Sequence, residues 1–360
     1  MLDKQEKMTA IERINALLSS QPVDRVPVWL WLISAPFAAK NVGYTVASSY
    51  IDVDMSFWSQ VWTQEMYGSD DIPRPSIGGT VKTTWAFGGE IKLPHGEYSQ
   101  APLAVRYPLE SGEDARKLEP PEDITQLGPI PLLMQFARMQ QEHGFPITVP
   151  CESPVEAVRG ICGMEMLCRW MIKSPEVVHR LLRLATDFQL KVAQYWVETF
   201  GPDRLMVQNT APTTSNQVIS PRQFEAFFLP YQKELHEKIL AMGVRHIFCH
   251  ICGDQNLNLP YWAQVPMGNP GIVSFGHEIS LATAIEYFGD TSIIAGNIEP
   301  VVIQMGTPQQ VYELCRQCIE DGKNAPRGYI LTPGCGLPPM APPYNVYMMV
   351  KAARDSGWYD

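Results

Sequence analysis

The sequence predicts an α/β protein, a single (β/α)₈ TIM barrel. From about residue 129 onward, short apolar segments alternate with amphipathic helical segments as far as the end of the chain. This alternation is typical of parallel strands with helices packed outside them. Polar residues, glycines and potential metal ligands gather at the ends of the apolar segments, where the active sites of such barrels lie. A doubly wound open sheet is the alternative, although no Gly-x-Gly-x-x-Gly follows the first strand.

Eight apolar runs are predicted to be the strands, and eight is the number that a closed barrel requires. The first, at 26–31, is apolar on both faces, which suits a parallel strand buried between layers. A weaker second run covers 71–75. The remaining strands are expected at 146–150, 203–208, 246–250, 271–275, 292–295 and 329–332, with helical segments between them that include 174–199, 220–242 and 307–321.

The first 124 residues are less regular than the rest. Thr9 precedes an amphipathic stretch with Glu12 at the capping-box position, so an N-terminal helix is expected over 10–18. From about 34 to 124 the pattern is irregular, and glycine pairs at 78–79 and 88–89 flank the run 81–85, which predicts a hairpin. We expect this region to be an insertion that forms part of the mouth, within one domain that spans 1–360.

The composition narrows the class of protein. A chain of 360 residues with 45% hydrophobic and 18% charged residues is typical of a globular protein. The net charge of −10 argues against a nucleic-acid surface. The first residues are too charged for a signal peptide, and no apolar run reaches the roughly 20 residues of a membrane helix, so a cytoplasmic protein is expected. In a reducing compartment its eight cysteines would be core residues, metal ligands or nucleophiles.

A potential metal site lies at the ends of two predicted strands. His250 and Cys252 are two residues apart in an extended segment, so their side chains leave the same face. Cys335, between two glycines, ends another strand. One imidazole and two thiolates favour Zn²⁺ over Mg²⁺ or Ca²⁺, and three protein ligands with an open fourth position are typical of a catalytic zinc that activates a bound thiol. The alternative is a histidine and cysteine that only pack or hydrogen-bond in the mouth.

Five other polar residues near strand ends are candidates for substrate binding. Glu152 follows the third predicted strand and Asn209 follows the fourth. Asn297 either orients a substrate or occupies a turn after Gly296. His277 and Glu278 could complete the metal shell, serve as acid or base, or simply hydrogen-bond in the mouth.

Three other cysteines are predicted to have a structural role. Cys249 alternates with the two potential ligands and should therefore point to the other face of its strand. The pair Cys315 and Cys318 has the C-x-x-C spacing but falls inside a predicted helix, which favours burial over a metal or redox role.

Several short motifs occur in order along most of the chain. They are Glu12-Arg13, the run 21–28, Ile219-Ser220-Pro221 with Phe224, Phe228, Pro230 and Tyr231, then Gly296-Asn297, Gly306-Thr307-Pro308, Gly334-Cys335-Gly336 and the run 343–346. Together they resemble the uroporphyrinogen decarboxylase superfamily. The His-x-Cys pair with a distant cysteine resembles the zinc-dependent methylcobamide:thiol (coenzyme M type) methyltransferase branch of that superfamily.

This resemblance implies a zinc ion held by His250, Cys252 and Cys335 as the catalytic residues. It also implies a corrinoid (cobalamin) carried by a partner protein, and methyl transfer between its methyl-cobalt and an acceptor at zinc, either a thiol or a pterin such as tetrahydrofolate. One alternative is a decarboxylase or lyase of the uroporphyrinogen decarboxylase type, although the stretch 29–36 lacks the arginines and the aspartate of that branch. The other is a non-catalytic corrinoid- or tetrapyrrole-binding module.

Overall fold

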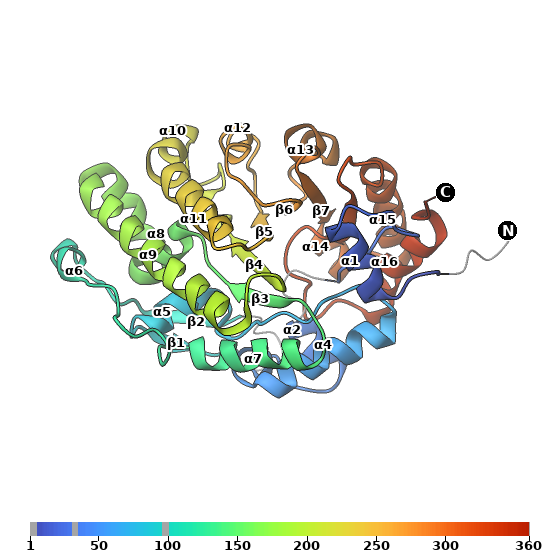
Figure 1. Ribbon diagram of the computed structural model, residues 1–360, viewed down its shortest axis with the longest axis horizontal. Coiled ribbons are helices and arrows are strands. Elements are labelled where there is room, and N and C mark those ends of the chain that lie inside the picture. Colours follow the sequence, from blue (N-terminus) through green and yellow to red (C-terminus); the bar gives the residue numbers. More distant parts are fainter. Residues whose placement is uncertain (1–5, 31–34, 96–100, 360) are drawn as a thin grey trace.

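The computed structural model describes residues 6–30, 35–95 and 101–359. At its centre six parallel strands lie side by side in chain order, and helices surround them (Figure 1). The strands are β3 (Ile147–Pro150), β4 (Leu205–Thr210), β5 (His246–Ile251), β6 (Gly271–Phe275), β7 (Ser292–Ile298) and β8 (Tyr329–Pro333). They agree with six of the apolar runs predicted from the sequence, although four of them, β4, β5, β7 and β8, end later than predicted.

Two extended segments occupy the remaining positions between β8 and β3. Val28 forms a parallel bridge with Leu331 of β8, and Asp70 N–H donates to Val28 O at 2.8 Å. Gln140 then connects the second segment to β3, because its Nε2 donates both to Pro73 O at 2.6 Å and to Thr148 Oγ1 at 3.0 Å. Neither segment forms a full ladder, since prolines at 27, 73 and 75 have no N–H to donate. The last residue of the first predicted strand, at 31, lies outside the described residues.

Buried ion pairs attach these two segments to the N-terminal helix α1 (Ala10–Leu18). The guanidinium groups of Arg13 and Arg25 both contact the carboxylate of Asp70, and all three side chains are about 1% exposed. The same carboxylate accepts the N–H of Val28 at 2.8 Å. Thr9 caps α1, and the predicted capping box with Glu12 is present. The charged residues near the start of the chain therefore hold the first segment in place beside β8.

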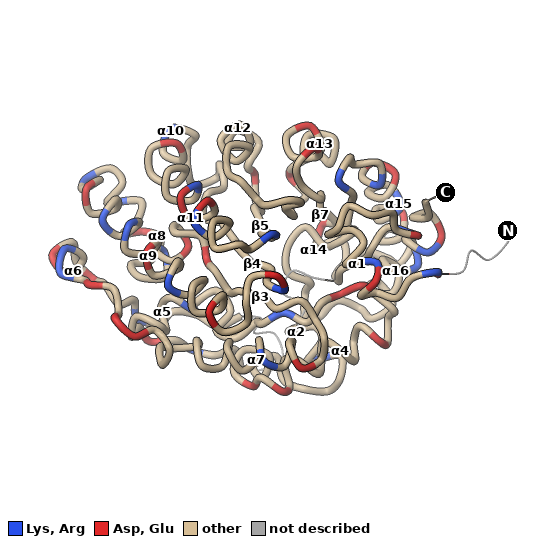
Figure 2. Tube along the Cα trace, viewed as in Figure 1, with Lys and Arg blue, Asp and Glu red and all other residues tan. Residues whose placement is uncertain are grey.

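Helices connect the strands and cover their outer faces. None of the strands β3 to β8 contains Asp, Glu, Lys or Arg, whereas both signs of charge are interspersed along the surrounding helices (Figure 2). Among the described residues no helix has the length and apolar character needed to cross a membrane. The larger helices are α4 (Val53–Tyr67), α7 (Ile130–Glu142), α8 (Pro154–Lys173), α9 (Pro175–Phe200), α11 (Leu229–Ala241), α13 (Leu281–Phe288), α15 (Pro308–Gly322) and α16 (Pro343–Ser356).

The shorter helices complete the connections between these elements. They are α2 (Ala35–Asn41), α3 (Ser48–Ile51), α5 (Lys82–Ala86), α6 (Gly112–Lys117), α10 (Pro221–Gln223), α12 (Leu259–Trp262) and α14 (Pro300–Met305), with a π-helical turn over Phe224–Phe228 and 3₁₀ turns over Gly79–Val81 and Pro212–Thr214.

The interior of the barrel is a separate apolar cluster. Met206, Phe248, Ile272 and Ile293 point inward from successive strands, and α1 covers this cluster with Ile14, Leu17 and Leu18. Because side chains alternate along a strand, the inward direction of Phe248 means that His250 also faces inward and Cys249 outward. Cys249 is indeed fully buried within the outer core, as the alternation predicts.

The glycine pairs at 78–79 and 88–89 do not flank a hairpin. The run between them forms a 3₁₀ turn and α5, and the antiparallel hairpin of β1 (Glu90–Lys92) and β2 (Leu103–Arg106) follows the second pair. Tertiary contacts explain the difference, because the side chains of Thr83 and Thr84 are buried against the start of α8, where Thr84 Oγ1 donates to Gly160 O at 2.7 Å. Packing on α8 therefore overrides the β propensity of these threonines.

Candidate active site

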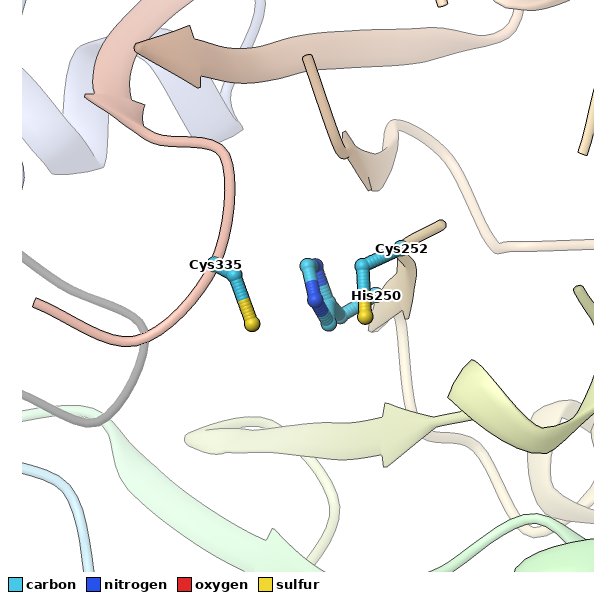
Figure 3. Close-up of side chains that lie close together, drawn as sticks. All are labelled: His250, Cys252 and Cys335. Carbon is cyan, nitrogen blue, oxygen red and sulfur yellow. The ribbon is translucent and has the colours of Figure 1, made fainter. Parts of the chain in front are cut away.

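Three potential metal ligands converge at the carboxyl end of the barrel. His250 lies near the end of β5, Cys252 follows that strand, and Cys335 follows β8. One ligand atom from each of the three side chains lies within 4.8 Å of the other two, and Figure 3 shows the three side chains close together. The sequence alone places His250 and Cys252 on one face; the curvature of the barrel brings Cys335 to them.

The imidazole of His250 has one nitrogen engaged and one open. It is 2% exposed, and its Nδ1 lies 3.1 Å from the hydroxyl oxygen of Ser274 on the neighbouring strand β6. Its Nε2 is buried and has no hydrogen-bond partner among the described residues. A buried polar atom without a partner costs roughly 1–3 kcal/mol. Coordination of a metal ion by Nε2 would remove that cost.

The two thiols interact directly, and this shifts their pKa values in opposite directions. A hydrogen bond from the Cys252 thiol lowers the pKa of Cys335, and the nearby imidazole of His250 lowers it further, against the effect of burial. The same hydrogen bond raises the pKa of Cys252 well above its usual range, as do burial and the nearby charges of Cys335, Glu156 and Glu278. Two soft thiolates and an imidazole fit the ligand preferences of Zn²⁺.

The loop after β6 carries His277 and Glu278, which lie beside the three ligands but outside that cluster. His277 is half exposed and lies between two carboxylates, with Nδ1 3.6 Å from Glu278 Oε2 and Nε2 3.9 Å from Glu299 Oε1. Oε2 of Glu278 is buried and accepts no hydrogen bond from the described residues. The carboxylate thus contributes negative charge at the edge of the site.

Two of the residues predicted to bind substrate, Asn209 and Asn297, form hydrogen bonds within the fold. Asn209 is fully buried on the outward face of β4, where its Nδ2 donates to Cys151 O at 3.1 Å and its Oδ1 accepts from Gln232 Nε2 at 3.0 Å. Asn297 donates to the backbone oxygens of Gly276 and Ile279, at 3.1 and 2.6 Å. The first amide therefore points away from the mouth, and the second holds the loop that carries His277 and Glu278.

Glu152 lies in a cavity of about 460 Å³ on the β3 and β4 side of the mouth. The cavity is formed by the start of α8, the ends of these strands, the loop after β4 and the insertion at 74–82. Thr210 lines the cavity and is the register partner of His250 in the neighbouring strand. Glu156 also lines the cavity, and its charge is one of the causes that raise the pKa of Cys252. The cavity therefore adjoins the His–Cys cluster.

Sequence reasoning did not identify several residues of the site. Ser274 could have been noticed, because it is the polar residue within the otherwise apolar run 271–275, at a position that faces inward with His250. The charged cavity residues gave no signal, since they lie on a helix and on an irregular segment. These are Arg74, Lys82, Glu156 and Arg159.

Comparisons with known proteins agree with this architecture. Residues 9–356 match the uroporphyrinogen decarboxylase (URO-D) family. The methylcobamide:CoM methyltransferase MtbA of Methanosarcina acetivorans is 25% identical over 359 residues, which covers 96% of this chain and 98% of that protein. The uroporphyrinogen decarboxylase of Xanthomonas oryzae pv. oryzae is 23% identical, with 95% of this chain and 98% of that protein covered.

A solved structure shows the same fold. A methyltransferase from Methanosarcina mazei superimposes with a TM-score of 0.79 at 23% identity, over 97% of this chain and 99% of that one. The resemblance inferred from the sequence is therefore confirmed, as is the α/β barrel architecture. This chain belongs to the uroporphyrinogen decarboxylase family.

Proposed function

We propose that this protein transfers a methyl group between a corrinoid protein and a thiol, at a zinc ion held by His250, Cys252 and Cys335. The observation that carries the proposal is the convergence of these three side chains around a buried imidazole nitrogen that has no partner. Full-length similarity to a protein named methylcobamide:CoM methyltransferase supports it. The names of such relatives support a thiol acceptor and offer nothing in favour of tetrahydrofolate.

The chemistry requires a deprotonated sulfur at neutral pH. A bound zinc ion would supply the positive charge that keeps the acceptor thiol in that state. The sulfur lone pair then forms the S–C bond to the methyl carbon while the C–Co bond breaks and its electron pair stays on cobalt, which leaves as Co(I). The thiolates of Cys252 and Cys335 would balance the charge of a bound zinc ion, so the acceptor sulfur would keep its nucleophilic character.

The rim of the mouth offers a surface for the corrinoid protein. Loops after the strands carry exposed apolar side chains, and three of these are more than half exposed: Leu257 after β5, and Val301 and Met305 on α14 after β7. A protein partner that docks over the mouth would cover these side chains. We propose that the whole chain acts as one catalytic domain and receives the corrinoid over this rim.

Methyl transfer from free methylcobalamin tests the proposal. With the purified protein, zinc and a thiol under anaerobic conditions, we expect Co(I) to appear by its absorbance. Cys252→Ala and Cys335→Ala should abolish the reaction, whereas Cys168→Ala should not, because Cys168 is a partly buried thiol on α8 outside the cluster. Equal activity in all three variants, or wild-type protein that binds no zinc, would contradict the proposed function. Decarboxylation of a porphyrinogen by the cysteine variants would support the lyase alternative.

A further inference from the structure

The cavity of about 460 Å³ beside the His–Cys cluster has no role assigned to it so far. Its volume lies within the roughly 300–1,000 Å³ typical of sites that enclose a drug-sized small molecule. Thr210 forms its wall next to His250. A thiol whose sulfur reaches the three ligands would therefore extend the rest of its structure into this cavity.

Every charge that lines the cavity already has a partner in the protein. Arg159 Nε donates to Glu156 Oε2 at 2.8 Å, and the other oxygen of Glu156 accepts from Thr213 N–H at 2.6 Å. Lys82 Nζ lies 3.9 Å from Glu152 Oε1, while Thr83 Oγ1 donates to Glu152 Oε2. These two ion pairs leave the middle of the cavity without an excess of either charge.

The third cation, Arg74, packs against two aromatic rings of the barrel. Its guanidinium carbon lies 4.2 Å from the centre of the Trp29 ring and 5.0 Å from that of Phe248, and the side chain is 2% exposed. Cation–π contacts of this kind hold a guanidinium group in place. An anionic ligand in the cavity would therefore have to compete with the carboxylates and aromatic rings that these cations already contact, and would lose its own hydration.

The rest of the lining is apolar or uncharged. Pro75, Met164, Pro212 and Val218 form apolar walls, and Gln208 and Thr210 offer polar groups near the cluster. We infer that the acceptor is a bulky uncharged thiol that carries a ring, rather than a short thiol with an anionic tail. This inference rests on the proposed function and narrows its substrate class. The reaction is R–S⁻ + CH₃–Co(III) → R–S–CH₃ + Co(I), in which the acceptor thiol first loses its proton to solvent.

Three thiols that differ in charge and size test the inference: 2-phenylethanethiol, 2-mercaptoethanol and 2-mercaptoethanesulfonate, each with zinc-loaded protein and methylcobalamin. We expect kcat/KM to be at least about tenfold higher for 2-phenylethanethiol than for 2-mercaptoethanesulfonate. The opposite order would overturn the inference while leaving the proposed function intact. No methyl transfer to any of the three would instead contradict the proposed function.

Two variants separate the effects of charge and size. Glu152→Gln removes the carboxylate beside Lys82. The ratio of kcat/KM for 2-mercaptoethanesulfonate to kcat/KM for 2-mercaptoethanol should therefore rise. An unchanged ratio would mean that the pairing of Glu152 with Lys82 is not what disfavours the anionic thiol. Met164→Trp fills the cavity and should raise KM for 2-phenylethanethiol about tenfold. Ile172→Trp is the matched control, because Ile172 lies 78% exposed near the end of the same helix. Equal KM values in both tryptophan variants would exclude this cavity as the binding site.

Discussion

The imidazole of His250 and the hydroxyl of Ser274 face each other across adjacent strands, with Nδ1 3.1 Å from Oγ. Both side chains are almost completely buried. The contact fixes the plane of the ring and leaves Nε2 as the nitrogen available to a metal ion. Hydrogen bonds of this kind orient metal-binding histidines in general.

Ser274→Ala should weaken metal binding without removing a ligand. Partners of metal-binding histidines typically contribute about 10–100-fold to metal affinity, and we expect a loss in this range when zinc is competed against a chelator. The absorption spectrum of the Co²⁺-substituted protein should shift as the ring reorients. Ser292→Ala is the control, since Ser292 is a buried serine at the start of β7. An equal loss of affinity in both variants would show that Ser274 has no orienting role.

Zinc should stabilise the folded protein through all three ligands. A ligand that binds only the native state at 100 times its Kd adds about 2.7 kcal/mol to the free energy of unfolding, so zinc should raise the Tm of the metal-free protein. Cys335→Ala should lose this rise, and Cys168→Ala should keep it. A rise of Tm that survives in Cys335→Ala would place the metal somewhere else.

The buried imidazole of His236 predicts a loss of stability in mild acid. Burial lowers the pKa of His236 to about 4; Gln232 Nε2 lies 2.7 Å from its Nε2, and its Nδ1 lies 2.8 Å from Pro266 O. Between pH 6.5 and 4 the unfolded chain binds a proton that the folded protein does not, so stability falls as the pH falls. We expect about 2 kcal/mol of the decrease between pH 7 and pH 5 to come from this residue.

Urea unfolding at the two pH values measures this contribution. His236→Asn should be less stable at pH 7 but should show a smaller decrease towards pH 5 than the wild type. An identical decrease in the two proteins would mean that His236 titrates normally in the folded state.

The backbone after Cys252 should tolerate only glycine. Gly253 has a φ of 75°, and an added Cβ would lie 2.8 Å from Ser215 Oγ. Gly253→Ala should cost about 1–3 kcal/mol and should lower the zinc content by displacing Cys252. Gly43→Ala separates strain from steric overlap, because Gly43 has a φ of 86° with open space around it. If the two variants lose equal stability and both keep their zinc, the overlap at Ser215 has no effect on the site.

The alternation of side chains explains which residues the sequence could place. His250 and Cys252 share a face in any extended segment, and Cys249 must then face outward, as the structure shows. The same rule places Asn209 on the outward face, because Met206 faces inward and Gln208 and Thr210 share its face. A shift of one residue in a strand exchanges its two faces, so a role in the mouth cannot be assigned from strand ends alone.

By itself the sequence determined the alternation of strands and helices, the six regular strands and the three potential metal ligands. These features follow from the periodicity of apolar residues and from the types of residues that are close together in the sequence. Only the tertiary structure decided that Cys335 meets His250 and Cys252, that Ser274 orients the imidazole, and that the charges around the cavity pair with one another. Such contacts join residues far apart in the chain, and their geometry depends on the curvature of the barrel and on the packing of α5 against α8.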